Sequence, residues 1–158
     1  MVPEKMPRMS ETEIVQLLED QILCRIAFCG KQAPFIALFQ YALIGDKLYF
    51  HFTNYGKKIE LLSEDKTVCV EIENYTPDLS EYKFVTMTGK LRLVTDPAER
   101  ALAIEKIVDT ARKRLLSDNF ILAHGFPKEK GWGFLTPEKP LLIVKLDSIT
   151  EKIGLKSS

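Results

Sequence analysis

A pair of lysines in the first half of the chain provides the clearest candidate for chemistry. Lys57 and Lys58 come shortly after Asn54, whose side-chain oxygen suits the N-cap of a helix. Two cations in a first helical turn are repelled by the positive end of the helix dipole, which costs roughly 0.3–1 kcal/mol for each charge. A bound anion, held by free backbone N–H groups and by the lysines, removes this conflict. We therefore predict a phosphate site here; the alternative is a pair of solvated surface lysines.

The residues before this turn alternate between two faces, as a strand requires. The segment 48–53 reads LYFHFT, so His51 and Thr53 share a face opposite Phe50 and Phe52. His51 is one of two histidines in the chain. Packing of the strand is the interpretation that the pattern itself offers for this side chain. The other histidine, His124, matches no motif and is expected in a loop or at a helix end.

The three cysteines do not indicate a metal or disulfide site. Cys24, Cys29 and Cys69 are odd in number and lack the CxxC spacing of a zinc site. We expect all three to be small buried hydrophobic residues, and we predict no metal.

Composition excludes some classes of function. The chain of 158 residues has 22 Lys and Arg and 22 Asp and Glu, so no global field favours nucleic acid or an anionic membrane. No apolar run reaches the length of a membrane span, and the N-terminal residues lack the apolar core of a secretory signal. We expect one cytoplasmic domain over residues 1–158.

Caps, turns and periodic apolar residues predict the elements that position these candidates. Ser10 and Glu13 have capping-box spacing, and Asp96 with Pro97 and Glu99 is the clearest helix start. We predict a helix capped by Ser10, strands at 22–28, 34–43, 48–53, 67–73 and 82–95, a helix from Asp96 to about Leu116, a short helix at 118–124, a loop at 125–137 and a last strand at 141–146. Residues 1–9 and 150–158 are expected to be loose ends.

Short connections between these strands favour antiparallel pairing and closure into a small barrel. In the long strand at 82–95, Val85, Met87, Leu91 and Leu93 are expected on one face. Gly89, between them, is predicted to mark a bend or bulge.

The segment 34–43, PFIALFQYAL, is apolar on both faces. A strand in an antiparallel hairpin usually has one wet face. The second face must therefore be covered either by a partner chain or flat ligand, or by the protein's own helices.

The ordered set of these pieces resembles the pyridoxamine 5′-phosphate oxidase-related flavoproteins, and in particular their nitroimidazole-reductase-like branch. The resemblance covers residues 24–73 and extends more loosely to Thr95. It is carried by the segments 25–27 (RIA), 34–37 (PFIA), 48–51 (LYFH), 56–58 (GKK), 68–71 (VCVE) and 89–94 (GKLRLV).

The resemblance implies a mainly β fold with flanking helices, a six-stranded antiparallel split β-barrel with Greek-key-like connections. It implies a homodimer with FMN at its interface. Ala37, Leu38 and Phe39 are then expected to border the flavin ring, largely through their backbone. The remaining implied cofactor-binding residues are His51, Phe52, Thr53 and Asn54 near the ring or ribityl chain, and Lys57 and Lys58 at the phosphate, with Lys58 favoured.

The function implied is that of an FMN-dependent oxidoreductase acting on a small oxidised substrate. The alternative is a carrier or sensor that holds a flavin, a deazaflavin or haem on the same barrel. The sequence departs from the family at Ala37, at Phe84 and at Glu151–Lys152, where many relatives carry other residues. No acid or base is nominated, because the flavin carries the chemistry in such proteins.

Overall fold

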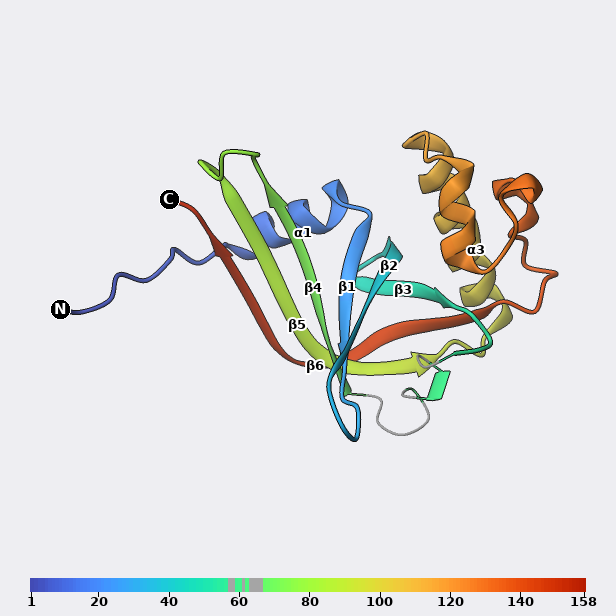
Figure 1. The fold of residues 1–158 in the computed structure, drawn as a ribbon, viewed down its shortest axis with the longest axis horizontal. Coiled ribbons are helices and arrows are strands. Elements are labelled where there is room, and N and C mark those ends of the chain that lie inside the picture. The colour runs from blue at the N-terminus through green and yellow to red at the C-terminus, as the bar shows by residue number, and fades with distance from the viewer. Residues whose placement is uncertain (57–58, 61, 63–66) are drawn as a thin grey trace.

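Six antiparallel strands close into a barrel in the computed structural model, which describes residues 1–56, 59–60, 62 and 67–158 (Figure 1). The strands are β1 (Leu23–Phe28), β2 (Phe35–Ile44), β3 (Lys47–Phe52), β4 (Thr67–Tyr75), β5 (Tyr82–Leu93) and β6 (Leu142–Lys156). Around the barrel they follow the order β1-β2-β3-β6-β5-β4, and β4 pairs back to β1. The predicted class, a six-stranded antiparallel barrel with flanking helices, is confirmed.

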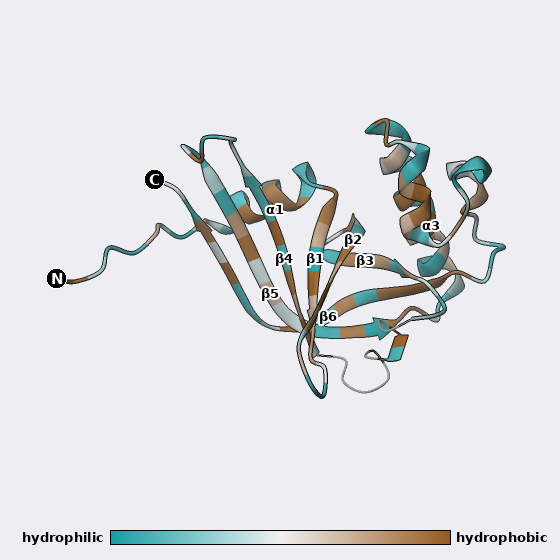
Figure 2. Ribbon diagram, viewed as in Figure 1, coloured by the Kyte–Doolittle hydropathy of each residue, from teal (hydrophilic) through white to brown (hydrophobic). Residues whose placement is uncertain are grey.

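The barrel interior is filled by the apolar residues that alternate along each strand. Four aromatic rings form its centre, with Phe39 stacked on Phe52 at a centroid distance of 4.8 Å, and Phe28 and Phe50 packed edge-on around them. Edge-to-face and offset arrangements are the favoured geometries of such rings. Figure 2 shows hydrophobic residues alternating with more hydrophilic ones along the strands.

Helices α1 and α3 flank the barrel, and both begin where their caps predict. Helix α1 (Glu11–Asp20) has the complete capping box of Ser10 and Glu13, and its buried leucines join the barrel's interior cluster. Helix α3 (Pro97–Lys113) is capped by Asp96 and ends three residues before the predicted Leu116. None of the helices that the structure describes is long and apolar enough to span a membrane.

A second hydrophobic layer lies between the barrel wall and α3. It contains Tyr49 and Ile143 from the wall, Ile104 and Ile107 from α3, and Trp132 from the segment that follows. That segment holds three 3-10 helices, η1 (Asp118–His124), η2 (Lys128–Lys130) and η3 (Trp132–Phe134). Figure 1 shows α3 and these helices packed together beside β3 and the first half of β6.

The C-terminal tail was wrongly predicted to be loose. Strand β6 is 15 residues long and continues to Lys156, pairing with β5 from Thr88↔Glu151 to Lys83↔Lys156. Strand β5 is itself long, so a shorter β6 would leave half of it unpaired. The charged residues that made the tail look frayed lie on its outer side, where Lys156 Nζ donates to Glu13 at 2.8 Å.

The N-terminal arm is only partly loose. Arg8 forms a β-bridge with Leu155, and the Met9 N–H donates to the Gly154 carbonyl at 2.9 Å. Met9 is buried in the core. The expected loose segment therefore ends before these residues.

Gly89 occupies a bulge, as predicted. The β5–β6 register shifts between Thr88 and Lys90, and a Cβ at Gly89 would lie 2.8 Å from the Asp147 carbonyl oxygen. The alternation continues past Gly89, so Leu91 is fully buried as predicted, whereas Leu93, predicted inside, is 51% exposed at the end of the strand.

The prediction that all three cysteines are buried was wrong for one of them. Cys24 is buried inside the barrel, and burial raises the pKa of its thiol. Cys69 is half-buried, whereas Cys29 is exposed because it follows the last residue of β1.

Candidate functional site

A pocket of about 340 Å³ lies at the C-terminal end of β3, within the size range of small-molecule sites. Its lining is mainly apolar. One side is the end of β3 and the turn after it, and the other is the segment after η1 together with the start of β6. The lining residues are His51–Tyr55, His124–Phe126, Phe134 and Lys139–Leu142.

The end of β3 supplies the residues predicted for this site. Because side chains alternate along the strand, Phe50 and Phe52 enter the barrel core and His51 faces the outer layer. The strand ends at Phe52, and the Thr53 hydroxyl donates to the Tyr55 carbonyl at 3.2 Å, which closes the turn.

His51 belongs to a buried chain of polar side chains. Its Nδ1 lies 3.1 Å from Nδ1 of His124, and Nε2 of His124 lies 2.9 Å from Oε1 of Gln40. The Gln40 amide then donates to the carbonyl of Ile107 in α3 at 3.1 Å. The chain thus links β3, η1, β2 and α3.

Aromatic rings surround the two imidazoles. Phe126 lies parallel to His51 at a centroid distance of 6.1 Å, and the edges of Phe120 and Trp132 approach His124 at 6.0 and 5.5 Å. This packing buries most of both imidazoles and restricts their orientations.

The far wall of the pocket is held by α3. Nε of Arg100 donates to the Leu141 carbonyl at 3.0 Å, and Nη1 donates to the Pro137 carbonyl at 2.7 Å. These bonds fix the segment that carries Lys139, whose ammonium sits 4.1 Å from the centroid of the Phe134 ring. A cation over an aromatic face is a favourable contact, so the pocket includes a positioned positive charge.

Tyr49, two positions before His51, is part of an ionic cluster next to this wall. Its hydroxyl donates to Glu99 at 2.6 Å, and Lys145 Nζ lies 2.9 Å from the same carboxylate. Burial, followed by the hydrogen bond to Glu99, raises the pKa of Tyr49 to about 12. Hydrogen bonds from Tyr49 and Lys145 lower the pKa of Glu99. The phenol therefore stays protonated and joins β3 to α3 and β6.

The structure brings together only part of the predicted cofactor set. His51, Phe52, Thr53 and Asn54 all line the pocket. Lys57 and Lys58, and with them the predicted phosphate site, lie outside the described residues. Just beyond them, Ile59 packs against the barrel core.

Ala37, Leu38 and Phe39 do not line this pocket. They lie on β2, where its pairing with β3 has stopped: the β2–β3 register runs from Ile44↔Lys47 to Tyr41↔Phe50. Within the described residues, the segment from Phe35 to Gln40 therefore has strand partners on β1 and none on β3. The two groups of predicted residues therefore lie on neighbouring strands, beyond the point where the β2–β3 pairing ends.

The two faces of β2 show what covers its apolar run. Gln40 and Ala42, in the second half, are buried under α3, as expected for coverage by the protein's own helix. In the first half, Ile36 is 63% exposed and Leu38 is 51% exposed. The protein's own helix therefore covers the second half of the strand, whereas coverage of the first half by a partner chain or a flat ligand stays a prediction.

Sequence reasoning missed two residues of the site, Gln40 and His124. Gln40 is the one polar residue in the apolar run 34–43, and this is the only signal that marked it. His124 does end a helix, as predicted, but its burial against β3 depends on how η1 packs.

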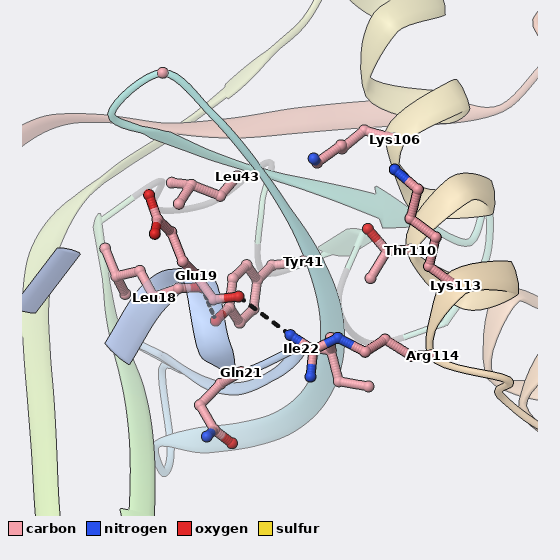
Figure 3. Close-up of a pocket in the computed structure, with 11 residues that line it drawn as sticks. Leu18, Glu19, Gln21, Ile22, Tyr41, Leu43, Lys106, Thr110, Lys113 and Arg114 are labelled. Atoms are coloured by element: carbon pink, nitrogen blue, oxygen red, sulfur yellow. Dashed lines mark hydrogen bonds between the residues drawn. The ribbon is translucent and has the colours of Figure 1, made fainter. Parts of the chain in front are cut away.

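A second groove lies on another side of the molecule, between the end of α1, β2 and α3 (Figure 3). Here the Tyr41 hydroxyl donates to the Leu18 carbonyl at 2.6 Å, and Nη2 of Arg114 donates to the carbonyl of Asp20 at 2.9 Å. These bonds cap the carbonyl end of α1 and join it to α3. The groove contains none of the predicted site residues. Among the described residues, no cluster of His, Cys, Asp or Glu is arranged to hold a metal ion.

Comparison with solved structures supports the fold. An FAD-binding protein from Mesorhizobium loti superposes with a TM-score of 0.72 at 18% identity, covering 98% of each chain. The FAD-binding protein of Mycobacterium smegmatis superposes with a TM-score of 0.66 at 16% identity, covering 96% of this chain and 100% of that one. An FAD- and haem-binding protein from Mycobacterium smegmatis gives 0.66 at 16% identity, with coverage of 98% and 74%.

No curated protein matches the sequence. The family profile described as pyridoxamine 5′-phosphate oxidase, however, matches residues 10–124, well over half of the chain. The match includes every strand from β1 to β5 and both histidines. On this basis the chain belongs to the pyridoxamine 5′-phosphate oxidase family.

Proposed function

We propose that this protein binds FMN in the pocket at the end of β3 and acts as a flavin-dependent oxidoreductase on a small oxidised substrate. The observation that carries the proposal is that this mainly apolar pocket of about 340 Å³ is lined by His51, Phe52, Thr53 and Asn54. Family membership and the similarity to two FAD-binding proteins support it.

The residues present fit a flavin. A flat ring with one apolar and one polar edge needs hydrophobic walls and a few directed hydrogen bonds. Phe126, Phe134 and Leu141 supply apolar walls, and the backbone of Ala37 and Leu38, which have no strand partner on β3, offers N–H and C=O groups. The bound flavin would supply the electron-transfer chemistry, while the protein binds and orients it.

We assign the phosphate of the cofactor to Lys57 and Lys58, on the sequence argument alone. Asn54, which precedes them, lines the pocket. A phosphate bound beyond Asn54 would leave the ring end of the cofactor toward His51 and Thr53.

A homodimer is part of the same proposal. The outward side chains of Ile36 and Leu38 are more than half exposed, and they lie on the strand segment that has lost its β3 neighbour. Burial of apolar surface yields about 25 cal/mol per Å², so a dimer in which a second copy covers this face would be stabilised by that burial.

The purified protein tests the proposal directly. We expect a yellow protein whose visible spectrum bleaches with a reductant, and whose ligand, released by denaturation, has the mass of FMN. Release of FAD would retain the flavin site and overturn the choice of FMN. A colourless protein with no affinity for added FMN or FAD would overturn the whole proposal.

A binding function without turnover is the second candidate. It is favoured by one observation, the similarity to a protein described as binding both FAD and haem. A haem absorption band, or the mass of a deazaflavin in the released ligand, would identify it. A bound flavin that no common electron donor reduces would also favour this carrier role.

A further inference from the structure

Lys139 is a half-buried lysine whose position in the pocket lining is fixed from two sides. Its ammonium nitrogen lies 4.1 Å from the centroid of the Phe134 ring. The Arg100 guanidinium donates to the carbonyl of Lys139 itself, and also to the carbonyls of Pro137 and Leu141 on either side. Because the backbone and the ammonium are both held before any ligand arrives, binding through this lysine costs less ordering entropy than binding through a free surface lysine.

The pocket lining carries this positive charge without a negative one beside it. Among the described residues of the lining, Lys139 is the one lysine or arginine, and none is aspartate or glutamate. The neighbouring Glu138 is exposed, and its pKa is lowered mainly by a backbone hydrogen bond and by Thr136, with Lys139 the weakest cause. Half-burial among aromatic rings removes part of the hydration of the ammonium, so an anion supplied by a ligand would stabilise it.

A second ammonium adds to the positive field at the same ring. Nζ of Lys130 lies 5.4 Å from the centroid of Phe134, but Lys130 is exposed and does not belong to the described lining. The two lysines therefore differ in reach. Lys139 can contact a ligand in the pocket, whereas Lys130 acts on that ligand only at longer range.

The other lining residues indicate what the anionic group is attached to. Phe126 packs its edge against Phe134 at a centroid distance of 5.1 Å, and Leu141 continues this apolar wall. Such walls favour a planar, mainly apolar molecule. Pro140, next to Lys139, is exposed, so the charged end of the molecule lies toward the solvent and its ring lies deeper in the pocket.

We propose that Lys139 is a specificity-determining residue, which selects a planar, mainly apolar substrate with one carboxylate. One ammonium balances one negative charge, and it donates charge-assisted hydrogen bonds to the carboxylate oxygens. The inference rests on the proposed function only in calling this molecule the substrate, since binding at Lys139 does not require a flavin. Lys139 and Phe134 also lie beyond residue 124, where the match to the family profile ends.

Two probes of the same shape test the role of the charge. Para-nitrobenzoate and para-nitrobenzamide share a ring with an oxidised nitro group, and only the first is an anion. The purified protein, with any cofactor it retains, is titrated with each probe by calorimetry. We expect wild type to bind nitrobenzoate roughly tenfold or more tightly than nitrobenzamide. Lys139→Gln should abolish this preference by weakening nitrobenzoate alone, whereas Lys139→Arg keeps the charge and should retain the preference.

Lys130→Gln is the matched control, because it removes an ammonium from the same ring without changing the described lining. This variant should keep the preference for nitrobenzoate. Equal losses in Lys130→Gln and Lys139→Gln would overturn the assignment to Lys139. Equal affinity of wild type for the two probes, or binding of neither, would overturn the proposal whether or not the variants fold.

Flavin binding is measured on the same proteins, so that the two proposals can fail separately. If Lys139→Gln abolished a preference for FMN over riboflavin, the anion held at Lys139 would be the phosphate of the cofactor, and this inference would be wrong. A yellow protein without a preference for nitrobenzoate would likewise retain the flavin site and overturn the inference. A protein that binds no flavin but prefers nitrobenzoate through Lys139 would overturn the proposed function and support the anion site.

Discussion

Nδ1 of His51 and Nδ1 of His124 lie 3.1 Å apart although 73 positions separate the two residues in the chain. The contact joins the last turn of η1 to the end of a barrel strand. Both residues line the same pocket, so the shape of the pocket depends on how η1 ends.

The end of η1 is set by Gly125, and replacing it should open the contact. Gly125 has φ +84°, and a Cβ there would lie 2.9 Å from Cγ2 of Thr53. A left-handed conformation costs a residue with a side chain roughly 1–2 kcal/mol, and the clash adds to this. We expect Gly125→Ala to lower the free energy of unfolding by more than this conformational cost, measured by urea denaturation.

Gly45→Ala is the matched control for that measurement. Gly45 also has a positive φ, +63°, but nothing lies within 4 Å of a Cβ built on it. The free energy of unfolding of Gly45→Ala should therefore fall only by the conformational cost. Equal losses in the two variants would show that the approach of Gly125 to Thr53 is unimportant.

The local elements of this fold were readable from the sequence because their signals are local. The capping box of Ser10 and Glu13, the Asp96 cap and the alternation in 48–53 each depend on residues close together in the chain. The end of β6 was missed for the opposite reason. Its pairing with β5 is a long-range contact, and its charged residues resemble those of a frayed tail.

The contrast between local signals and long-range contacts also holds at the site. His51 was found because it stands in an alternating strand before a turn, whereas its partners became visible only once η1 and α3 had packed on the wall. A lone glutamine in an apolar run can be a satisfied core residue, an edge residue or a ligand contact. Only the Ile107 carbonyl, supplied by a distant helix, shows which of these Gln40 is.

Removing the end of β6 tests its place in the barrel. Deletion of residues 150–158 would leave the first half of β5, from Lys83 to Thr88, without its partner strand. We expect a large drop in melting temperature, or loss of the cooperative transition, followed by circular dichroism. Deletion of residues 2–6, which are exposed, should change it little. If deletion of residues 150–158 changed the melting temperature as little as deletion of residues 2–6, the prediction that the C-terminal residues are loose would be correct after all.

Glu13 should make stability depend on pH through the same strand. Its carboxylate accepts a hydrogen bond from Lys156, and also one from the Ser10 backbone N–H, which together lower its pKa from 4.5 to about 2. A carboxyl group whose pKa is lower in the folded state stabilises that state above its unfolded pKa, and this contribution is lost as the pH falls toward the folded pKa. We therefore expect Glu13→Gln to be less stable than wild type near pH 7.

That difference should shrink as the pH falls from about 4.5 toward 2. Glutamine keeps the capping-box geometry, so the variant isolates the charge. Glu4→Gln, which changes the same charge in the exposed N-terminal arm, is the control for net charge. If Glu13→Gln were as much less stable than wild type at pH 2 as it is near pH 7, this account would be contradicted.

The exposed face of β2 predicts the behaviour of a surface variant. If a second copy covers Leu38, then Leu38→Glu places a charge in that interface, and an unpaired buried charge is costly. We expect the molar mass from light scattering to fall from dimer to monomer at micromolar concentration. Leu115→Glu changes a residue that is 88% exposed just beyond α3 and should leave the mass unchanged. If the Leu38→Glu protein kept the mass of the wild-type dimer, this face of β2 would be excluded as the dimer interface.

The phosphate assignment of Lys57 and Lys58 makes a prediction that separates charge from fold. Hydrogen bonds to a charged group contribute roughly 1.5–3 kcal/mol, so each lysine that contacts the phosphate should strengthen FMN binding by roughly 10- to 150-fold. Riboflavin has the same ring and ribityl chain without the phosphate. The variants Lys57→Ala and Lys58→Ala should therefore weaken FMN binding while leaving riboflavin binding unchanged, as measured by quenching of flavin fluorescence.

The larger loss is expected for Lys58→Ala, because residues adjacent on a helix point about 100° apart and the family pattern favours the second lysine. Lys5→Ala, in the exposed N-terminal arm, controls for the loss of one positive charge. If the lysine variants bound FMN and riboflavin with equally reduced affinity, the lysines would shape the turn rather than hold the phosphate. An undiminished preference for FMN over riboflavin in the double variant would place the phosphate elsewhere, and the remaining positioned cation of the pocket, Lys139, would be the next to change.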